Sequence, residues 1–192
     1  MRLVADFPRV PTVLYICTCL HGQRFYAPNY RDTEYVGRLR AVARVLNEAP
    51  DIAPIMKVHT RGDNALNPIK AWCRREAPRV EVIDHAVRTD DLWKRADVVA
   101  LDLPTTPLLE ALARDLPVLV WTDPQVFPVT PESRVLLEEA VLYEPDWHAF
   151  LDHLRRGRPW VWQMLRGLTT ARQRTRNAGI AAWEQCLAEQ PA

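Results

Sequence analysis

The chain has 192 residues, of which 48% are hydrophobic and 26% are charged, and its formal net charge at pH 7 is +1. This is the composition of a globular protein with a substantial core, and it excludes a disordered or fibrous chain. The near-neutral balance gives no overall attraction for nucleic acid. No stretch reaches the roughly 18 continuous apolar residues of a membrane span, and the first residues do not resemble a signal peptide. The four cysteines lack the spacing of a disulfide framework, so we expect a cytoplasmic protein.

Apolar runs alternate with amphipathic segments along most of the chain. The runs predict strands at 12–19, 52–60, 79–85, 96–103, 117–122 and 141–144. Helices are predicted between and after them, at 34–48, around Trp72, around Leu92 and Trp93, at 105–114, at 131–140 with Thr130 as its cap, and at 146–155. Continuous apolar strands separated by helices favour a parallel sheet that is covered on both faces. We therefore expect a doubly wound, Rossmann-like α/β domain at residues 1–157 and a C-terminal helical tail at 158–192.

The fourth predicted strand leads into Pro-Thr-Thr-Pro at residues 104–107, and then into a helix. Doubly wound folds bind ligands beyond the carboxyl ends of their strands. Thr105 or Thr106 can cap the helix, and free N–H groups in its first turn, which Pro107 suits, favour a phosphate. Glu110, one turn further, can accept hydrogen bonds from neutral hydroxyls such as a ribose diol. The spacing alone fits a plain helix cap and a solvated glutamate equally well.

The segment "ADVVALDLPTTPLLEALARDLPVLVWTD" at 96–123 resembles the donor-binding domain of GT-B-type glycosyltransferases. It is most similar to the branch of bacterial surface-polysaccharide and CDP-glycerol glycerophosphotransferase-like enzymes, which carry a D-x-P-S-T-x-x-L-E-A-L-A-x-G-x-P run. Two further segments resemble that branch in the same order, "VLYICTCLHGQRFYAPNY" at 13–30 and "APIMKVHTRGD" at 53–63. The resemblance spans roughly residues 10–150 and implies one half of a GT-B fold.

This resemblance implies roles around the Pro-Thr-Thr-Pro junction. Thr105 and Thr106 would hold the diphosphate of a nucleotide-activated donor, and Glu110 would accept from its ribose. Asp102 would shape the turn. The chain departs from the family pattern in two places here. A threonine stands at 105 in place of serine, and residues 115–116 replace a glycine-containing turn, which we expect to adopt another conformation.

A second group of candidate residues follows the first two predicted strands. By resemblance His59 would contact phosphate, although a lone histidine after an apolar strand is more often structural. Lys57 and Arg61 flank it on the same face by strand alternation, and their charges favour phosphate contact. Thr60 stands where the family has a proline after the histidine. In the long loop after the first strand, Arg24 either approaches the donor or acceptor or packs on a neighbouring domain.

The remaining chemical signals are weaker. Cys17, Cys19 and His21 alternate along the first strand and beyond it, but a fourth ligand with zinc-like spacing is absent from the sequence. We therefore expect no metal, and we interpret the two cysteines as buried small hydrophobes. The six glycines form no dinucleotide or Walker fingerprint. We expect no cofactor besides the donor substrate, a nucleotide-activated sugar or polyol.

From Arg155 to Ala182 the chain contains no acidic residue, and Trp160 and Trp162 accompany the arginines. Three interpretations compete: a solvated helix face, a helix docked on another domain, and a basic aromatic surface on anionic lipid at the inner face of the membrane. Docking leads, because the last helix of two-domain transferases of this type commonly crosses to the first domain. Without that domain, a partner chain or a second copy would take its place.

The sequence thus predicts the donor-binding domain of a transferase in bacterial surface-polysaccharide synthesis, with no nucleic acid as partner. Helix N–H groups, hydroxyls and cations would stabilise the leaving phosphate. No residue is assigned as the catalytic base, because the family keeps its usual base and acceptor site in a preceding domain. We therefore expect activity to need a first domain or a partner chain. Two alternatives stay open: a nucleotide-sugar-binding or structural partner subunit, and a domain like those of sugar-nucleotide epimerases.

Overall fold

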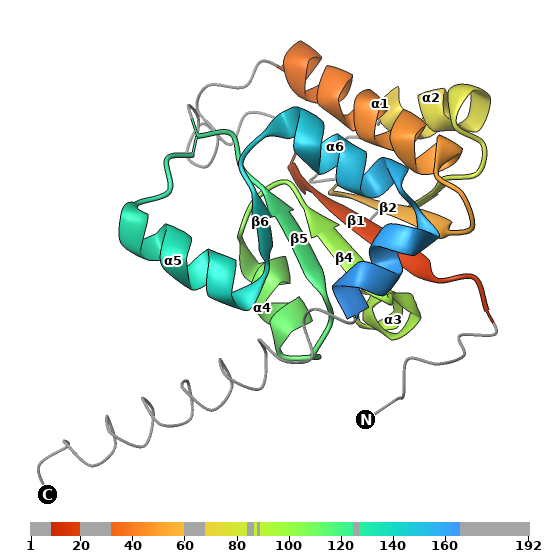
Figure 1. Cartoon of the computed structure of the whole chain (residues 1–192). Helices are drawn as coiled ribbons and strands as arrows, with labels where there is room; N and C mark the ends of the chain where they lie inside the picture. Colours follow the sequence, from red (N-terminus) through yellow and green to blue (C-terminus); the bar gives the residue numbers. More distant parts are fainter. Residues whose placement is uncertain are drawn as a thin grey trace, which may run out of the picture.

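The computed structural model of the chain describes residues 9–19, 32–59, 68–83, 87, 89–124 and 127–165. Its strands are β1 (Thr12–Cys19), β2 (Ala53–His59), β3 (Glu81–Ile83), β4 (Val98–Leu101), β5 (Val118–Trp121) and β6 (Leu142–Glu144). They form one sheet in the order β3-β2-β1-β4-β5-β6, and all neighbouring pairs are parallel (Figure 1). The strand order reverses between β1 and β4, at the centre of the sheet. This confirms the predicted doubly wound, Rossmann-like fold.

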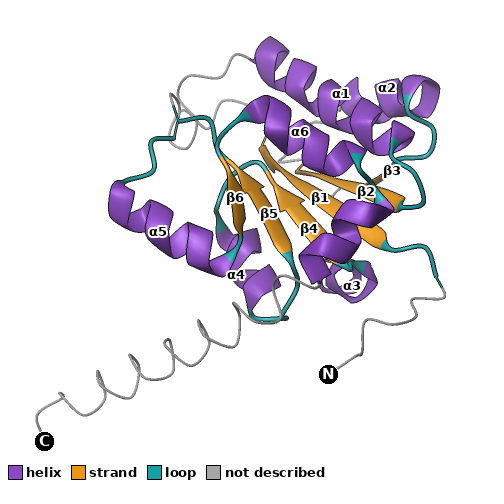
Figure 2. Ribbon diagram, viewed as in Figure 1, coloured by secondary structure: helices purple, strands orange, loops and turns teal. Residues whose placement is uncertain are grey.

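Helices cover both faces of the sheet, as Figure 2 shows. They are α1 (Asp32–Glu48), α2 (Pro68–Glu76), α3 (Thr89–Arg95), α4 (Thr106–Leu112), α5 (Pro131–Ala140) and α6 (Trp147–Arg155), and residues 158–165 are also helical. One core cluster joins the sheet to α1, α2, α6 and residues 158–165. The other joins it to α3 and α4, with α5 at its margin. The helices and strands match those predicted, with most ends shorter by a few residues.

β4 and β5 are apolar at every position, and β1 is apolar from Val13 to Cys17, as expected for strands that are covered on both faces. Val13 and Tyr15 of β1 face the α1 side, whereas Leu14 and Ile16 face the α3 side. All residues of β4 and β5 are buried. Successive side chains along these strands therefore point into two different cores, and neither set points into solvent.

The turn after α4 holds a residue other than glycine in the left-handed region. Asp115 stands where the family pattern has a glycine, and its φ of 54° lies in the left-handed region. The Asp115 N–H donates to the Leu112 carbonyl at 3.0 Å, and the Leu116 N–H donates to the Ala111 carbonyl at 3.0 Å. Aspartate tolerates this region better than most residues, and the two bonds satisfy carbonyls at the helix end.

Two side-chain caps fix the helices that follow β5 and β6. The Thr130 hydroxyl accepts from the Ser133 N–H at 3.2 Å, which confirms the predicted cap of α5. The Asp146 carboxylate accepts from the Ala149 N–H at 2.7 Å and starts α6. Both caps satisfy an N–H group that the helix itself leaves unpaired.

The beginning of the predicted C-terminal tail packs on the core. Gly157 has a φ of 60°, and it turns the chain so that the Arg158 N–H donates to the Pro50 carbonyl at 3.1 Å. Beyond this turn Trp160, Val161 and Met164 are buried in the α1-side cluster. The rest of the tail, residues 166–192, lies outside the described residues, so its partner and membrane interpretations stay predictions.

We predict that Gly157→Ala destabilises the domain by about 2–4 kcal/mol, from the cost of a left-handed alanine together with overpacking. A Cβ at this position would lie 2.3 Å from the Pro50 carbonyl oxygen. The matched control is Gly37→Ala in α1, whose Cβ would meet nothing within 4 Å. It should stabilise the helix by about 0.5–1 kcal/mol. Urea unfolding of both variants tests this, and equal effects would show that the turn at 157 has no special geometry.

Candidate functional site

The carboxyl end of β4 holds a buried carboxylate. Asp102, the first residue after the strand, is 6% exposed and accepts hydrogen bonds from the hydroxyls of Tyr15, at 3.2 Å, and Tyr35. Tyr15 belongs to β1, and Tyr35 lies in the first turn of α1. Asp102 therefore joins three elements at the point where the strand order reverses, which is where ligands bind in doubly wound sheets.

Tyr35 is held in its neutral form by this arrangement. Burial raises its pKa well above 10.0, and the charge of Asp102 raises it further. A protonated hydroxyl can donate, and a buried carboxylate needs donors because it has lost its hydration. The tyrosine and the aspartate thus satisfy each other inside the domain.

A second polar cluster lies on the same side of the sheet, at the end of β5. Arg38 of α1 pairs with Asp123 at 2.8 Å, and its guanidinium lies 4.8 Å from the ring centre of Trp121 and 5.8 Å from that of Trp147. Sequence reasoning missed this cluster. The available signal was that Asp123 follows β5 as Asp102 follows β4, each near the end of a wholly apolar strand.

The two threonines of the predicted phosphate site lie on the other side, at the start of α4. Thr105 occupies the N-cap position, but its side chain makes no capping hydrogen bond, so that part of the prediction is wrong. Pro107 lies in the first turn as predicted, and the Leu108 N–H already donates to the Thr105 carbonyl at 2.8 Å. Both threonine side chains are exposed. This turn therefore presents the two hydroxyls to solvent, and the Thr106 N–H belongs to the first turn of α4, where N–H groups have no partner within the helix.

Glu110 lies one helical turn after Thr106 and shares its face of α4. Its Oε2 accepts a hydrogen bond from the indole N–H of Trp93 at 2.9 Å. Trp93 is a buried residue of α3, so this bond ties α3 to α4. Sequence reasoning treated Glu110 as a solvated acid or a ribose acceptor, and it did not foresee this partner. The bond fixes one carboxylate oxygen and orients the other.

Lys57 near the end of β2 also lies on the α3 side of the sheet, since Ile55, two residues earlier, belongs to that core. Its Nζ donates to the Val87 carbonyl at 3.3 Å. On the opposite side, the thiol of Cys17 contacts the Lys57 carbonyl at 3.2 Å and is 4% exposed, which confirms Cys17 as a buried residue.

The sheet therefore divides the predicted site residues into two groups. Lys57, Thr105, Thr106 and Glu110 belong to the α3 and α4 side, whereas Asp102 belongs to the α1 side. His59 is the last residue of β2, and its side chain lies outside the described residues. The same holds for Arg24, Arg61, His21 and the side chain of Cys19.

Two absences hold for the described part of the chain. It contains no group of three or more histidine, cysteine, aspartate or glutamate side chains placed to hold a metal ion. None of its helices combines the length and the apolar character that crossing a membrane requires.

Comparison with solved structures shows which known proteins share this fold. TarM shares the fold with a TM-score of 0.53 and 8% identity, over 86% of this chain and 32% of its own. An O-GlcNAc transferase mutant from Thermobaculum terrenum gives 0.50 and 18% identity, over 92% of this chain and 33% of its own. The spinosyn forosaminyltransferase SpnP has a TM-score of 0.41 and 17% identity, over 97% of this chain and 46% of its own. No family model and no curated protein matches the chain.

These likenesses establish the fold. The chain has a doubly wound, Rossmann-like α/β fold, with the architecture of one half of a GT-B fold, and it shares this fold with TarM and the O-GlcNAc transferase. It spans about a third of the length of TarM and of the O-GlcNAc transferase. This confirms the resemblance and the fold class expected from the sequence.

We predict that Tyr35→Phe lowers the free energy of unfolding by about 1.5–3 kcal/mol at pH 8, because it removes a donor from a buried carboxylate. Above about pH 10 the unfolded wild-type chain releases the Tyr35 proton while the folded chain keeps it, since the folded pKa is raised. The wild-type protein should therefore lose up to about 1.4 kcal/mol per pH unit from this group, and the variant should not. In urea titrations from pH 8 to pH 11, the difference in the free energy of unfolding between the wild-type protein and Tyr35→Phe should become smaller. A constant difference would contradict the raised pKa of Tyr35.

Proposed function

We propose that this chain is the donor-binding domain of a glycosyltransferase, or of a related polyol-phosphate transferase, in surface-polysaccharide synthesis. The observation that carries the proposal is the start of α4. There Thr105 and Thr106 present hydroxyls beyond the carboxyl edge of a parallel sheet, and Glu110 lies one turn along the same helix face. The fold shared with known transferases supports the proposal.

In this proposal the nucleotide diphosphate accepts hydrogen bonds from Thr105, Thr106 and the Thr106 N–H. Lys57, on the same side of the sheet, adds a positive charge that favours the phosphates. Glu110 accepts from the ribose through the oxygen that Trp93 does not engage. These donors stabilise the charge that develops on the leaving phosphate. In this proposal every group that binds the donor belongs to this chain.

A second candidate is a nucleotide-sugar-binding subunit without chemistry of its own. The three carboxylates near this edge favour it, because each already accepts a hydrogen bond from a neighbouring side chain. Asp102 accepts from two tyrosines, Glu110 from Trp93, and Asp123 from Arg38. A general base must lie within hydrogen-bond reach of the acceptor hydroxyl, and in the first proposal the second Glu110 oxygen is already assigned to the ribose.

We predict that Thr106→Ala and Glu110→Ala each weaken binding of a nucleoside diphosphate by about 1–3 kcal/mol, the cost of leaving a partner unpaired. Calorimetry with CDP, UDP and GDP, and with their sugar or polyol derivatives, measures this and identifies the nucleotide. Matched controls are Thr130→Ala before α5 and Glu138→Ala within it, which remove the same chemical groups outside α4. Unchanged affinity in both test variants would exclude α4 from the site.

We further predict that the purified chain binds the donor but catalyses little beyond its slow hydrolysis. The physical reason is that, among the described carboxylates, Asp102 and Asp123 are engaged by tyrosines and by Arg38, and the proposal assigns the second Glu110 oxygen to the ribose. Release of nucleotide from the best-binding donor, measured with and without a panel of sugar acceptors, tests this. Fast transfer by the isolated chain would contradict the prediction and assign a base within it.

A further inference from the structure

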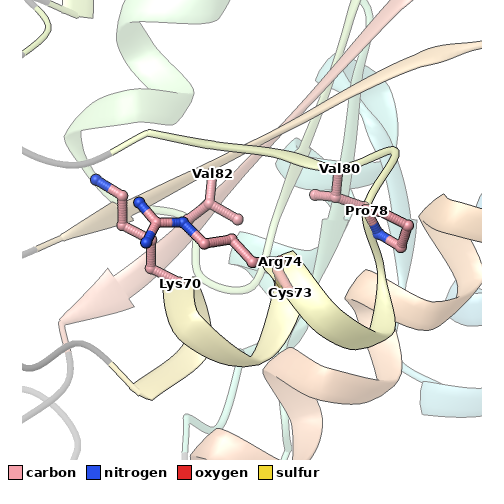
Figure 3. A pocket seen from close by; sticks show the side chains of 6 residues that line it. All are labelled: Lys70, Cys73, Arg74, Pro78, Val80 and Val82. Carbon is pink, nitrogen blue, oxygen red and sulfur yellow. The ribbon is translucent and has the colours of Figure 1, made fainter.

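The described residues line a groove on each side of the sheet. On the α1 side, a groove of about 270 Å³ lies between α2 and β3, and Figure 3 shows the side chains that line it. On the α3 side, a groove of about 540 Å³ lies between α3 and the end of α4. Trp93 and Arg114 line this second groove, and Trp93 bonds to Glu110. The α3–α4 groove therefore adjoins the donor site proposed at α4.

Trp93 places an indole N–H between α3 and α4. Its side chain is 3% exposed, so close packing holds the ring in place. Its Nε1 donates to Oε2 of Glu110 at 2.9 Å. A buried indole N–H usually has a partner, and the charge of a carboxylate strengthens such a bond. Glu110 is only half-buried, so the fixed indole restrains a side chain that would otherwise move more freely in solvent.

Arg114, just after α4, supports this contact at the surface. Its guanidinium lies 5.7 Å from the ring centre of Trp93. One of its nitrogens donates to the Glu110 carbonyl and another to the Asp90 carboxylate, both at 2.9 Å. That carbonyl belongs to the last turn of α4, where carbonyls lack a partner within the helix. Arg114 thus binds the backbone of the glutamate, the ring that holds its side chain, and the first turn of α3.

These contacts prepare Glu110 to accept further hydrogen bonds. An ionised carboxylate has roughly four acceptor positions on its two oxygens, and the Trp93 N–H uses one of them. A glutamate side chain ordinarily loses rotamer freedom when it binds a ligand, and this loss weakens binding. Here Trp93 has already restrained the side chain before any ligand arrives. A ribose diol gains from this restraint, whereas a sugar without these hydroxyls gains nothing.

We propose that Trp93 is a positioning residue of the donor site. It holds the Glu110 carboxylate for the two ribose hydroxyls, so that the site selects a ribonucleotide donor over a deoxyribonucleotide that lacks the diol. Arg114 supports this role from the surface. Trp93 is buried and acts only through Glu110. The inference rests on the proposed function, because it takes the donor to bind at α4.

Calorimetry on the full chain tests the proposal with CDP, UDP and GDP, each compared with its 2′,3′-dideoxy form. Trp93→Phe keeps an aromatic ring but removes the N–H donor. We expect it to weaken binding of the best ribonucleotide by about fivefold or more, as for a lost bond to a charged group. Binding of the dideoxy form should change by less than about twofold, as for an independent contact. Glu110→Ala should show the same selectivity, and Trp93→Phe should add nothing to it.

Trp160→Phe is the matched control for Trp93→Phe. Trp160 is also a buried tryptophan, 1% exposed, but it belongs to the α1-side core and its indole N–H bonds to no described residue. This variant should bind both forms of the nucleotide as the wild-type protein does. A second test variant, Arg114→Met, changes an exposed side chain and keeps the indole. It should also weaken binding of the ribonucleotide and not of the dideoxy form, which tests the proposal even if Trp93→Phe does not fold.

The indole N–H resonance of Trp93 gives a readout that does not depend on affinity. Its loss in Trp93→Phe assigns it in NMR spectra. The saturating ribonucleotide should shift this resonance, because its hydroxyls share the carboxylate that accepts the indole proton. The dideoxy form at saturation should shift it less. Equal shifts with both forms would contradict a role through the ribose.

The outcomes separate this inference from the donor proposal. If Glu110→Ala weakens ribonucleotide binding selectively and neither Trp93→Phe nor Arg114→Met does, the inference fails and the donor proposal stands. Equal weakening of both nucleotide forms in Trp93→Phe would show a merely structural role and overturn the inference. Nucleotide binding that Glu110→Ala leaves unchanged would remove Glu110 from the site, and the inference would fail with that part of the donor proposal. A wild-type chain that binds no nucleotide would overturn both.

Discussion

The buried Asp102 carboxylate is the constraint on which the centre of this domain depends. It sits where the strand order reverses, and a charge in that position needs donors in place of water. The hydroxyls of Tyr15 and Tyr35 provide them from β1 and α1. The Asp102 side chain thus connects β4 and β1, which belong to the two halves of the sheet, with α1. These bonds also hold the start of the turn that carries Thr105 and Thr106.

The two sides of the sheet have different chemistry around this centre. On the α1 side, carboxylates at the strand ends are consumed in structural contacts, with tyrosines at Asp102 and with Arg38 at Asp123. On the α3 side, the hydroxyls of Thr105 and Thr106 stay exposed. The polar groups on the α1 side thus bond to one another, whereas the α3 side presents hydroxyls that can bond to a ligand. A binding surface needs this division, because its hydroxyls must stay available for hydrogen bonds to the ligand and must not be used by the rest of the domain.

Local patterns in the sequence predicted the fold well, because each strand is a continuous apolar run and each helix has its own periodicity. The caps of α5 and the position of Pro107 are also local and were predicted. The partners of the site residues could not be predicted in this way. Tyr15 and Tyr35 lie 87 and 67 residues from Asp102 in the sequence, and Trp93 lies 17 residues from Glu110. Such pairs are set by strand order and helix packing, which no window of the sequence contains. Asp115 differs again: its left-handed turn is local, but propensity favours glycine there, and the hydrogen bonds at the end of α4 outweigh that preference.

The turn at Gly157 has a consequence for how the domain is made on the ribosome. The α1-side core contains Val13 from the first strand and Met164 from the last described helix, so it draws on nearly the whole length of the described chain. A nascent chain that has reached residue 156 already carries all six strands, but it lacks Trp160, Val161 and Met164 for that core. Domains generally fold as units during synthesis, and distant contacts form slowly because their loops must close first. Completion of this core is therefore tied to the end of translation of the domain, and until then the growing chain exposes apolar surface that chaperones recognise.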